Sequence, residues 1–307
     1  MISRSARIVL TALGVTSAIA LSACASADPL AEEGDASSSS MTNQPIVVGS
    51  QDYYSNEIIA EIYAQALENA GFTVDRQMRI GQREVYLPEI EAGRVDLFPE
   101  YTGPLLKYWN DAATATLSDD VYDALVNTAP EGLYVLDQAP ATDQDSYVVT
   151  QKFAKQWNLT SIADLAQVTT PLVMGANSEA ENRPNGPKGL KKTYGVTASF
   201  TPIEDSGGPL TVKALTDDEI QLAIIYSSDP SISANKLVTL EDTKGLFLAS
   251  HVVPLASMKI SSEAAAVINS VSAKLTSEEL LALNSRSISE QLPAGTIAKD
   301  WLAAQGM

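Results

Sequence analysis

The sequence predicts an α/β fold of two lobes, each a mostly parallel sheet flanked by helices, joined by two hinge crossings. Short β-type runs alternate with segments of helical periodicity after residue 45, which is typical of sheets covered on both faces. About 260 residues remain for this folded body, enough for two lobes of ordinary size. A local pattern of turn, strand and tyrosine also occurs twice along the chain.

The predicted strands are short apolar runs bounded by turn residues. They lie at 46–49, 95–98, 147–149, 172–174, 222–225 and 252–255. Between the first two, apolar residues recur at helical spacing from Ile58 to Ala70, and Gly71 is expected to close this helix. Late helices are expected from about 261 to 304, where Thr276 and Glu279 resemble the two ends of a capping box.

The repeated pattern places two tyrosines at equivalent positions. Gly71 precedes Tyr101 by 30 residues and Gly195 precedes Tyr226 by 31, and each tyrosine follows an apolar strand. Ligands of open α/β sheets bind beyond the carboxyl ends of the strands, so Tyr101 and Tyr226 are expected on opposite walls of one cleft. A chance likeness of two βαβ units is the alternative interpretation.

The lobe boundaries follow from this arrangement. We expect the first lobe at 46–147 plus 250–307 and the second at 148–249, with crossings near 147–150 and 251–256. Two crossings would allow the lobes to close around a ligand.

The N-terminal residues have the pattern of a secretory signal over residues 1–23. Arg4 and Arg7 precede an apolar run that is too short to span a bilayer, and Leu21-Ser22-Ala23-Cys24 follows. This box resembles that of bacterial lipoproteins, so we expect Cys24, the only cysteine, to carry lipid. Residues 24–45 would then form a lipidated, polar and flexible tether on the extracytoplasmic face of the cell membrane.

The charge balance limits the choice of ligand. The chain has 38 Asp and Glu against 20 Lys and Arg, a formal net charge of −18. Such acidity argues against nucleic acid, whose phosphates require a basic face. It is compatible with a cationic ligand, although many secreted proteins are acidic simply for solubility.

Four segments, at 48–53, 93–103, 181–195 and 240–255, carry a family pattern, and the most specific contains Pro99-Glu100-Tyr101-Thr102-Gly103. Together they resemble the substrate-binding lipoproteins of ABC importers for glycine betaine, choline and related osmoprotectants. The resemblance covers about 46–260 in consistent order. It implies a type II periplasmic-binding-protein fold, a permease and an ATPase as partners, and no cofactor.

In that family, tyrosines surround the trimethylammonium head of the ligand. A quaternary ammonium has no N–H to donate, but aromatic faces attract it. Tyr101, Tyr147 and Tyr226 match three of these tyrosines, while Ser250 stands where the fourth would be. One wall of the cage is therefore missing or rebuilt, and Tyr53 or Tyr54 is a candidate to rebuild it.

Three further positions are predicted to contact the ligand. Arg183 matches an arginine that can grip a carboxylate with two parallel hydrogen bonds, and Asp145 would add negative charge near the ammonium. Gln51 stands where a lysine is often found. The structural alternatives are that the tyrosines are core aromatics and that Arg183 pairs with neighbouring glutamates, Glu179 or Glu181.

Two alternatives to a quaternary-ammonium carrier remain open. The Ser250 departure would also fit the same fold binding another small solute, such as an amino acid or a different amine. A surface-anchored hydrolase would need an acid–base pair such as Asp96 and Glu100. His251 is the only histidine, and no Gly-x-Ser-x-Gly elbow occurs, so we expect neither a metal cluster nor a catalytic triad, and no enzyme.

Overall fold

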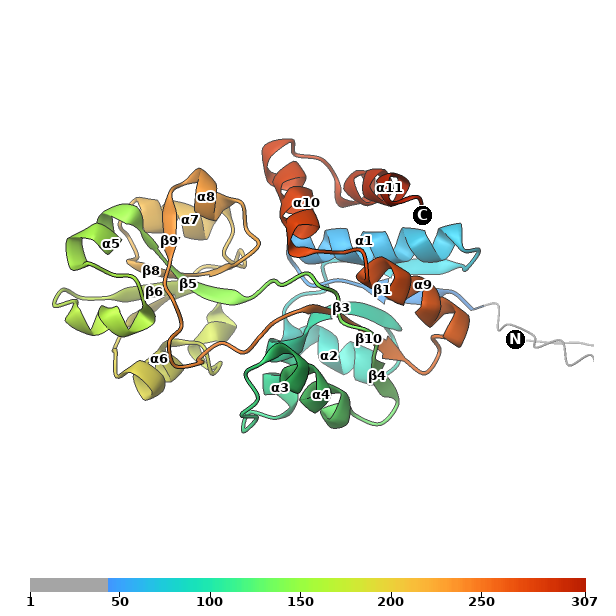
Figure 1. Ribbon diagram of the computed structural model, residues 1–307, viewed down its shortest axis with the longest axis horizontal. Helices are drawn as coiled ribbons and strands as arrows, with labels where there is room; N and C mark the ends of the chain where they lie inside the picture. The colour runs from blue at the N-terminus through green and yellow to red at the C-terminus, as the bar shows by residue number, and fades with distance from the viewer. Residues whose placement is uncertain (1–43) are drawn as a thin grey trace, which may run out of the picture. The chain divides into compact units, whose positions relative to one another are not determined.

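The computed structural model describes residues 44–307, which form two five-stranded sheets with helices on both faces (Figure 1). The predicted signal peptide, lipidated Cys24 and nearly all of the tether lie outside the described residues. Within residues 44–307, no helix is both long and apolar enough to span a membrane.

The first sheet has the strand order β2-β1-β3-β10-β4. Its strands are β1 (Ile46–Gly49), β2 (Val74–Gln77), β3 (Leu97–Tyr101), β4 (Leu133–Val135) and β10 (Val252–Ser257). β1 runs parallel to β2 and β3, whereas β10 is antiparallel to both its neighbours, so β10 is the only reversed strand of this sheet. The prediction of a mostly parallel sheet is therefore confirmed for this lobe.

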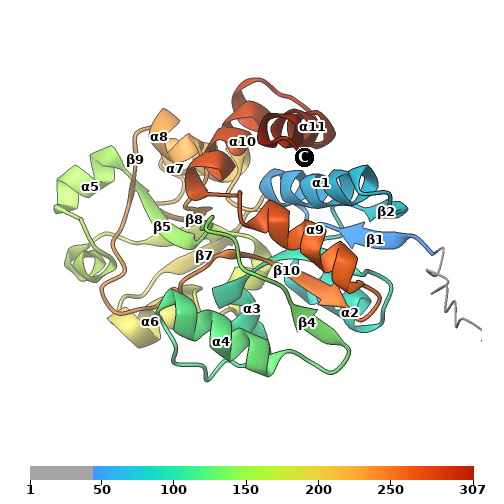
Figure 2. The same cartoon turned by 45° about the vertical axis from the view of Figure 1, so that its right-hand side comes forward.

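Seven helices cover the two faces of this sheet. They are α1 (Tyr54–Asn69), α2 (Arg83–Glu91), α3 (Thr102–Trp109), α4 (Ser118–Thr128), α9 (Ser262–Ser272), α10 (Ser277–Ser289) and α11 (Ala294–Gln305). α1, α9, α10 and α11 pack on one face, and α2, α3 and α4 on the other (Figure 2). β10 alternates accordingly, with Val252 and Ala256 in one apolar cluster and Val253 and Leu255 in the other.

The second sheet repeats this plan in the order β7-β6-β8-β5-β9. Its strands are β5 (Asp145–Thr150), β6 (Val173–Ala176), β7 (Ser199–Pro202), β8 (Leu222–Tyr226) and β9 (Leu237–Thr239). Its helical segments are α5 (Gln151–Trp157), α6 (Pro187–Tyr194), α7 (Pro209–Thr216), α8 (Ser231–Ala234) and the 3₁₀ turns η1 (Ile162–Gln167) and η2 (Ser178–Glu181). Here β5 is the reversed strand, antiparallel to β8 and β9.

The chain passes between the sheets at 136–144 and returns at 240–251. The two passages are paired with each other, since the Asp143 amide donates to the Ser250 carbonyl at 3.1 Å and the Val252 amide to the Ala141 carbonyl at 3.0 Å. The predicted boundary at 147–148 falls inside β5, whose pairing with β8 already begins at Asp145. The segments predicted as crossings, 147–150 and 251–256, instead lie largely in strands β5 and β10.

Local signals account for most element boundaries. α1 ends at the predicted position, and Gly71 takes a φ of 91° there. The Thr276 hydroxyl accepts from the Glu279 amide at 3.2 Å at the start of α10, as predicted. The strand predicted at 95–98 runs from Leu97 to Tyr101. Just before it, the Asp96 carboxylate accepts from the Val47 amide at 3.0 Å.

Candidate functional site

Tyr101 and Tyr226 end the central strands β3 and β8 of the two sheets. Tyr53, just before α1, connects them: its hydroxyl is hydrogen-bonded to that of Tyr101, and its ring stacks on Tyr226 with centroids 4.9 Å apart and planes at 29°. Burial raises the pKa of Tyr53 and Tyr101 above the ordinary value, so both phenols stay neutral. Three phenol rings from two lobes therefore meet at one point.

A small inner cavity of about 20 Å³ is lined by two of these three tyrosines, Tyr101 and Tyr226. Its walls hold five of the seven predicted ligand-binding residues, Gln51, Tyr101, Asp145, Arg183 and Tyr226, together with Arg83, Pro104 and Asp143. This volume is about what one water molecule needs.

A larger cavity of about 290 Å³ shares part of this wall. Arg83, Pro104, Asp145 and Arg183 line both cavities. The larger one adds an apolar side from the return passage, formed by 246–248, and it also reaches Ser250. The two cavities are therefore neighbours along the junction between the sheets.

The structure does not bring Tyr147 to either cavity. Its ring is fully buried in the apolar core of the second lobe, edge-on to Phe247, and its hydroxyl donates to the Asn185 carbonyl at 2.8 Å. The Asn185 side chain in turn donates to the Asp145 carboxylate at 2.8 Å. Tyr147 thus supports a loop at the site, and the core-aromatic alternative describes it better than a cage wall.

Ser250 and His251 belong to the return passage. The Ser250 hydroxyl donates to the Asp143 carbonyl at 2.8 Å, which ties the two passages together. The His251 ring lies with Nδ1 2.8 Å from the Ala139 carbonyl, and His251 lines neither cavity. Of the two candidates to rebuild the wall predicted to be missing at Ser250, Tyr53 is the one whose ring stacks on Tyr226 and whose hydroxyl is bonded to Tyr101.

Asp143 is a site residue that the sequence analysis missed. Its carboxylate is 3% exposed and accepts from the Tyr53 hydroxyl and from the Ser228 amide, both at 3.1 Å. Burial raises its pKa to about 6. Burial also raises the pKa of Asp145, against the attraction of Arg183 and Arg83. Two carboxylates therefore face the same small cavity.

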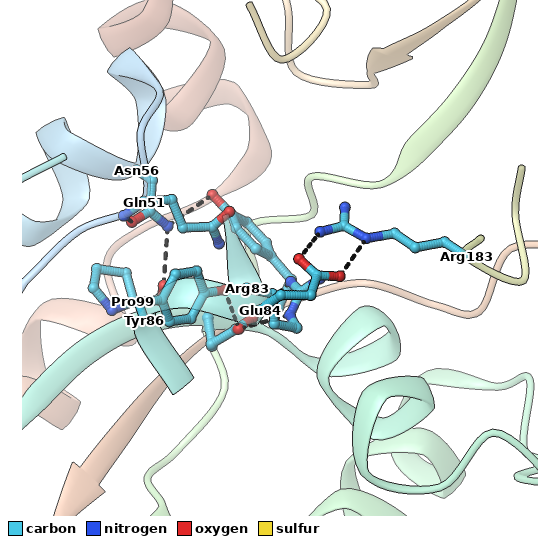
Figure 3. A network of polar contacts seen from close by, with 9 residues as sticks. Gln51, Asn56, Arg83, Glu84, Tyr86, Pro99 and Arg183 are labelled. Carbon is cyan, nitrogen blue, oxygen red and sulfur yellow. Dashed lines mark hydrogen bonds and ion pairs between the residues drawn. The ribbon is translucent and has the colours of Figure 1, made fainter. Parts of the chain in front are cut away.

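Arg83 was also missed, and it forms a buried network with Glu100. Its guanidinium donates twice to the Glu100 carboxylate, at 2.9 and 3.0 Å, and Glu100 is fully buried (Figure 3). The Tyr86 hydroxyl and the Tyr101 amide donate to the same carboxylate. Because each charge satisfies the other, the pair is tolerable without water. In the sequence, the only indication of this cation is that Glu100 lies in a motif that ends a buried strand, where a carboxylate needs a positively charged partner.

Arg183 forms an ion pair with a protein carboxylate, but this carboxylate is neither Glu179 nor Glu181. Its guanidinium forks onto Glu84 of α2, at 3.1 and 2.8 Å, and so joins the two lobes (Figure 3). Tyr54 also connects the two lobes, since its hydroxyl donates to the Asp229 carboxylate at 2.9 Å. Pairing of Arg183 with Glu179 or Glu181 is therefore not what the structure contains.

Gln51 is held at the base of the cavity by its backbone. Its amide donates to Asn56 Oδ1 at 2.8 Å, and the Asn56 side chain donates to the Pro99 carbonyl at 2.9 Å (Figure 3). The Gln51 side chain is 5% exposed, and its Nε2 has no hydrogen-bond partner among residues 44–307. A buried amide without a partner marks a place where a bound molecule can satisfy it.

The acid–base pair considered for a hydrolase is not assembled. The Asp96 carboxylate accepts from the Ser257 hydroxyl at 3.0 Å and lies 3.1 Å from the Lys259 ammonium. Glu100 is committed to Arg83. Each carboxylate is thus paired with its own cation, and neither lines the two cavities.

Comparison with known proteins agrees with this geometry. Residues 44–304 match the model of the substrate-binding domain of ABC-type glycine betaine transport systems. The glycine betaine-binding protein YehZ of Escherichia coli is 27% identical over 278 residues, covering 85% of this chain and 91% of that protein.

Solved structures share the fold. A glycine betaine/carnitine/choline ABC transporter structure aligns with a TM-score of 0.68 at 21% identity, over 85% of this chain and 98% of that one. The structure of Escherichia coli YehZ aligns with a TM-score of 0.60 at 26% identity, over 86% and 99%. The chain therefore belongs to the family of substrate-binding domains of ABC-type glycine betaine transport systems, with the two-lobed type II periplasmic-binding-protein fold.

Proposed function

We propose that this protein captures a quaternary-ammonium solute between its lobes, outside the cytoplasm, and delivers it to the permease of an ABC importer driven by an ATPase. The observation that carries the proposal is the meeting of Tyr53, Tyr101 and Tyr226 beside two buried carboxylates. Aromatic faces and carboxylates attract a positive charge that cannot donate a hydrogen bond. The binding proteins to which the chain is similar carry ligands of this class in their names.

The expected interaction free energies are sufficient for micromolar binding. Three aromatic faces contribute about 0.5 to 2 kcal/mol each, depending on desolvation. Micromolar affinity needs about 8 kcal/mol, so the cage supplies part and the carboxylates Asp143 and Asp145 supply charge attraction for the rest.

Binding also requires movement. A cavity of about 20 Å³ admits about one water molecule, so a trimethylammonium group needs the rings of Tyr53 and Tyr226 to part. The passages 136–144 and 240–251 are the natural hinge, because residues 44–307 run between the sheets only there. The larger cavity is then the route by which a solute reaches the tyrosines.

Attachment to the membrane is part of the proposal. The predicted signal and Cys24 would place a lipid anchor ahead of the folded body, with the polar tether between them. Metabolic labelling with a radioactive fatty acid should label the wild-type chain and leave Cys24→Ser unlabelled.

The tyrosine cage is tested by truncating its walls. Tyr101→Ala and Tyr226→Ala should each weaken choline or glycine betaine binding at least tenfold, because each removes a face from the cation. Isothermal titration calorimetry measures this. Tyr134→Ala is the matched control: its hydroxyl donates to the Ile260 carbonyl, outside both passages, and it lines neither cavity. Unchanged affinity in both cage variants would refute the proposal.

A second candidate is favoured by the larger cavity. Its volume of about 290 Å³ and its apolar side at 246–248 would accommodate a bulkier amine than choline. Competition of labelled choline by a panel of amines, amino acids and sugars separates the candidates. Stronger competition by a larger amine than by unlabelled choline would favour the second.

A further inference from the structure

Ser228, in the turn after β8 of the second lobe, is bound from outside its own lobe. The Asn284 amide nitrogen, on α10 of the first lobe, donates to the Ser228 carbonyl at 3.1 Å and to its hydroxyl at 3.0 Å. The Ser228 amide donates to the carboxylate of Asp143, in the passage between the sheets, at 3.1 Å. The turn that follows Tyr226 is therefore held by the first lobe and by the hinge together.

These contacts continue to the tyrosines without a break. The Asp143 carboxylate also accepts from the Tyr53 hydroxyl at 3.1 Å, and the Tyr53 hydroxyl is bonded to that of Tyr101. The Tyr53 ring stacks on Tyr226, two residues before Ser228. The end of β8 is thus attached to the first lobe twice, through the stacked rings and through the turn that α10 binds.

Asn284 contributes to this arrangement through its amide nitrogen alone. The side chain is fully buried, its Oδ1 has no hydrogen-bond partner among residues 44–307, and it lines neither cavity. Ser228 is 6% exposed, and within the same residues its carbonyl accepts a hydrogen bond only from Asn284. Asn284 therefore does not touch the solute, but the Ser228 carbonyl depends on it for a partner.

The loss of this donor has different consequences for the joined and the separated lobes. Separation exposes Ser228 to water, which can take the place of Asn284. With the lobes joined, removal of the Asn284 donor leaves a buried carbonyl unsatisfied, which costs more than the net contribution of an intact hydrogen bond. The loss therefore penalises only the closed form, in which the rings of Tyr53 and Tyr226 are in contact.

We propose that Asn284 is a positioning residue for solute retention, which holds the turn after Tyr226 against the first lobe and so stabilises the closed form. This inference rests on the proposed function and extends the binding machinery to a helix outside the cavities. A solute that both lobes bind leaves only when they separate, so the closed population determines how long it stays. The dissociation rate is the quantity that Asn284 controls.

The variant Asn284→Leu tests this role, because it removes the donor and roughly keeps the side-chain volume. Its rate of solute dissociation should rise at least fivefold, while the association rate stays within about twofold, because the first encounter is with the open form. Stopped-flow fluorescence with choline and with glycine betaine measures both rates. A melting curve confirms that the variant is folded.

Ser272→Ala is the matched control, since Ser272 is equally buried and its hydrogen bond with the Tyr63 hydroxyl, at 3.0 Å, lies inside the first lobe. It should leave both rates unchanged. If Asn284→Leu does not fold, Ser228→Ala replaces it; this variant loses only the hydroxyl part of the contact and should raise the dissociation rate about twofold.

Three results would overturn the inference while the proposed function survives. They are a wild-type dissociation rate in the folded variant, slower association with unchanged dissociation, and an equal rise of the dissociation rate in Ser272→Ala. Binding of neither compound by the wild-type protein would overturn both the inference and the proposed function.

Discussion

At the residue scale, burial of the charged Asp143 carboxylate lowers the free energy of unfolding. Its pKa is raised to about 6 by burial, above an unfolded value of about 3.9. The folded state therefore binds a proton more readily than the unfolded chain between pH 4 and pH 6. Stability falls as pH rises through this window, and a penalty of about 3 kcal/mol is then present above it.

The variant Asp143→Asn removes this penalty and the charge together. Without ligand, its melting temperature at pH 7.5 should exceed that of the wild type, and its stability should decline less between pH 4 and pH 6. Part of the decline remains, because the pKa of Asp145 is raised as well. Choline binding should weaken at least tenfold. Thermal unfolding from pH 4 to pH 8 measures the first effect, with exposed Asp137→Asn as the control; a lower melting temperature than wild type at pH 7.5 would contradict the account.

At the element scale, helix α6 fixes the loop that carries Arg183 and Asn185. Gly186 caps this helix and Pro187 begins it, which suits the first turn because proline lacks the amide hydrogen. A Cβ on Gly189 would lie 1.5 Å from the Pro184 carbonyl oxygen. The loop therefore rests directly on the helix backbone, and only glycine permits this approach.

Gly189→Ala should displace that loop. We expect a lower melting temperature and at least tenfold weaker binding of the quaternary-ammonium ligand, because Asn185 would lose its position against Asp145. Gly295→Ala in α11 is the control, since its Cβ would meet no atom closer than 3.7 Å. Calorimetry and melting curves on both variants provide the comparison. Wild-type affinity in Gly189→Ala would show that the loop does not position the site.

At the scale of the whole folded body, the side-chain contacts that bridge the lobes are mostly polar. Besides the stacked rings of Tyr53 and Tyr226, they are Arg183 with Glu84, Gln82 donating to Ser206 at 3.1 Å, Tyr54 donating to Asp229, and Asn284 donating to the Ser228 carbonyl and hydroxyl at 3.1 and 3.0 Å. Polar contacts that can be replaced by water contribute little net free energy. Separating the lobes about the two passages therefore costs little free energy. A cation that attracts groups from both lobes would favour closure.

The sequence was sufficient for the fold and for part of the site. Apolar periodicity located the strands and the long helices, and strand ends located Tyr101 and Tyr226. Tyr147 lies two residues further into β5 than Asp145, where Phe247 and the Asn185 loop cover it, a packing that the strand pattern alone does not reveal. Asp143 and Arg83 were missed because their roles depend on contacts with residues far along the chain, which local patterns do not contain.

The most direct test of the central claim is a crystal structure of the complex with choline. The account predicts the quaternary nitrogen within about 6 Å of the ring centroids of Tyr53, Tyr101 and Tyr226, the range of cation–π attraction, with Asp143 and Asp145 on the same side. A nitrogen seated against the apolar side of the larger cavity, away from the three rings, would contradict it.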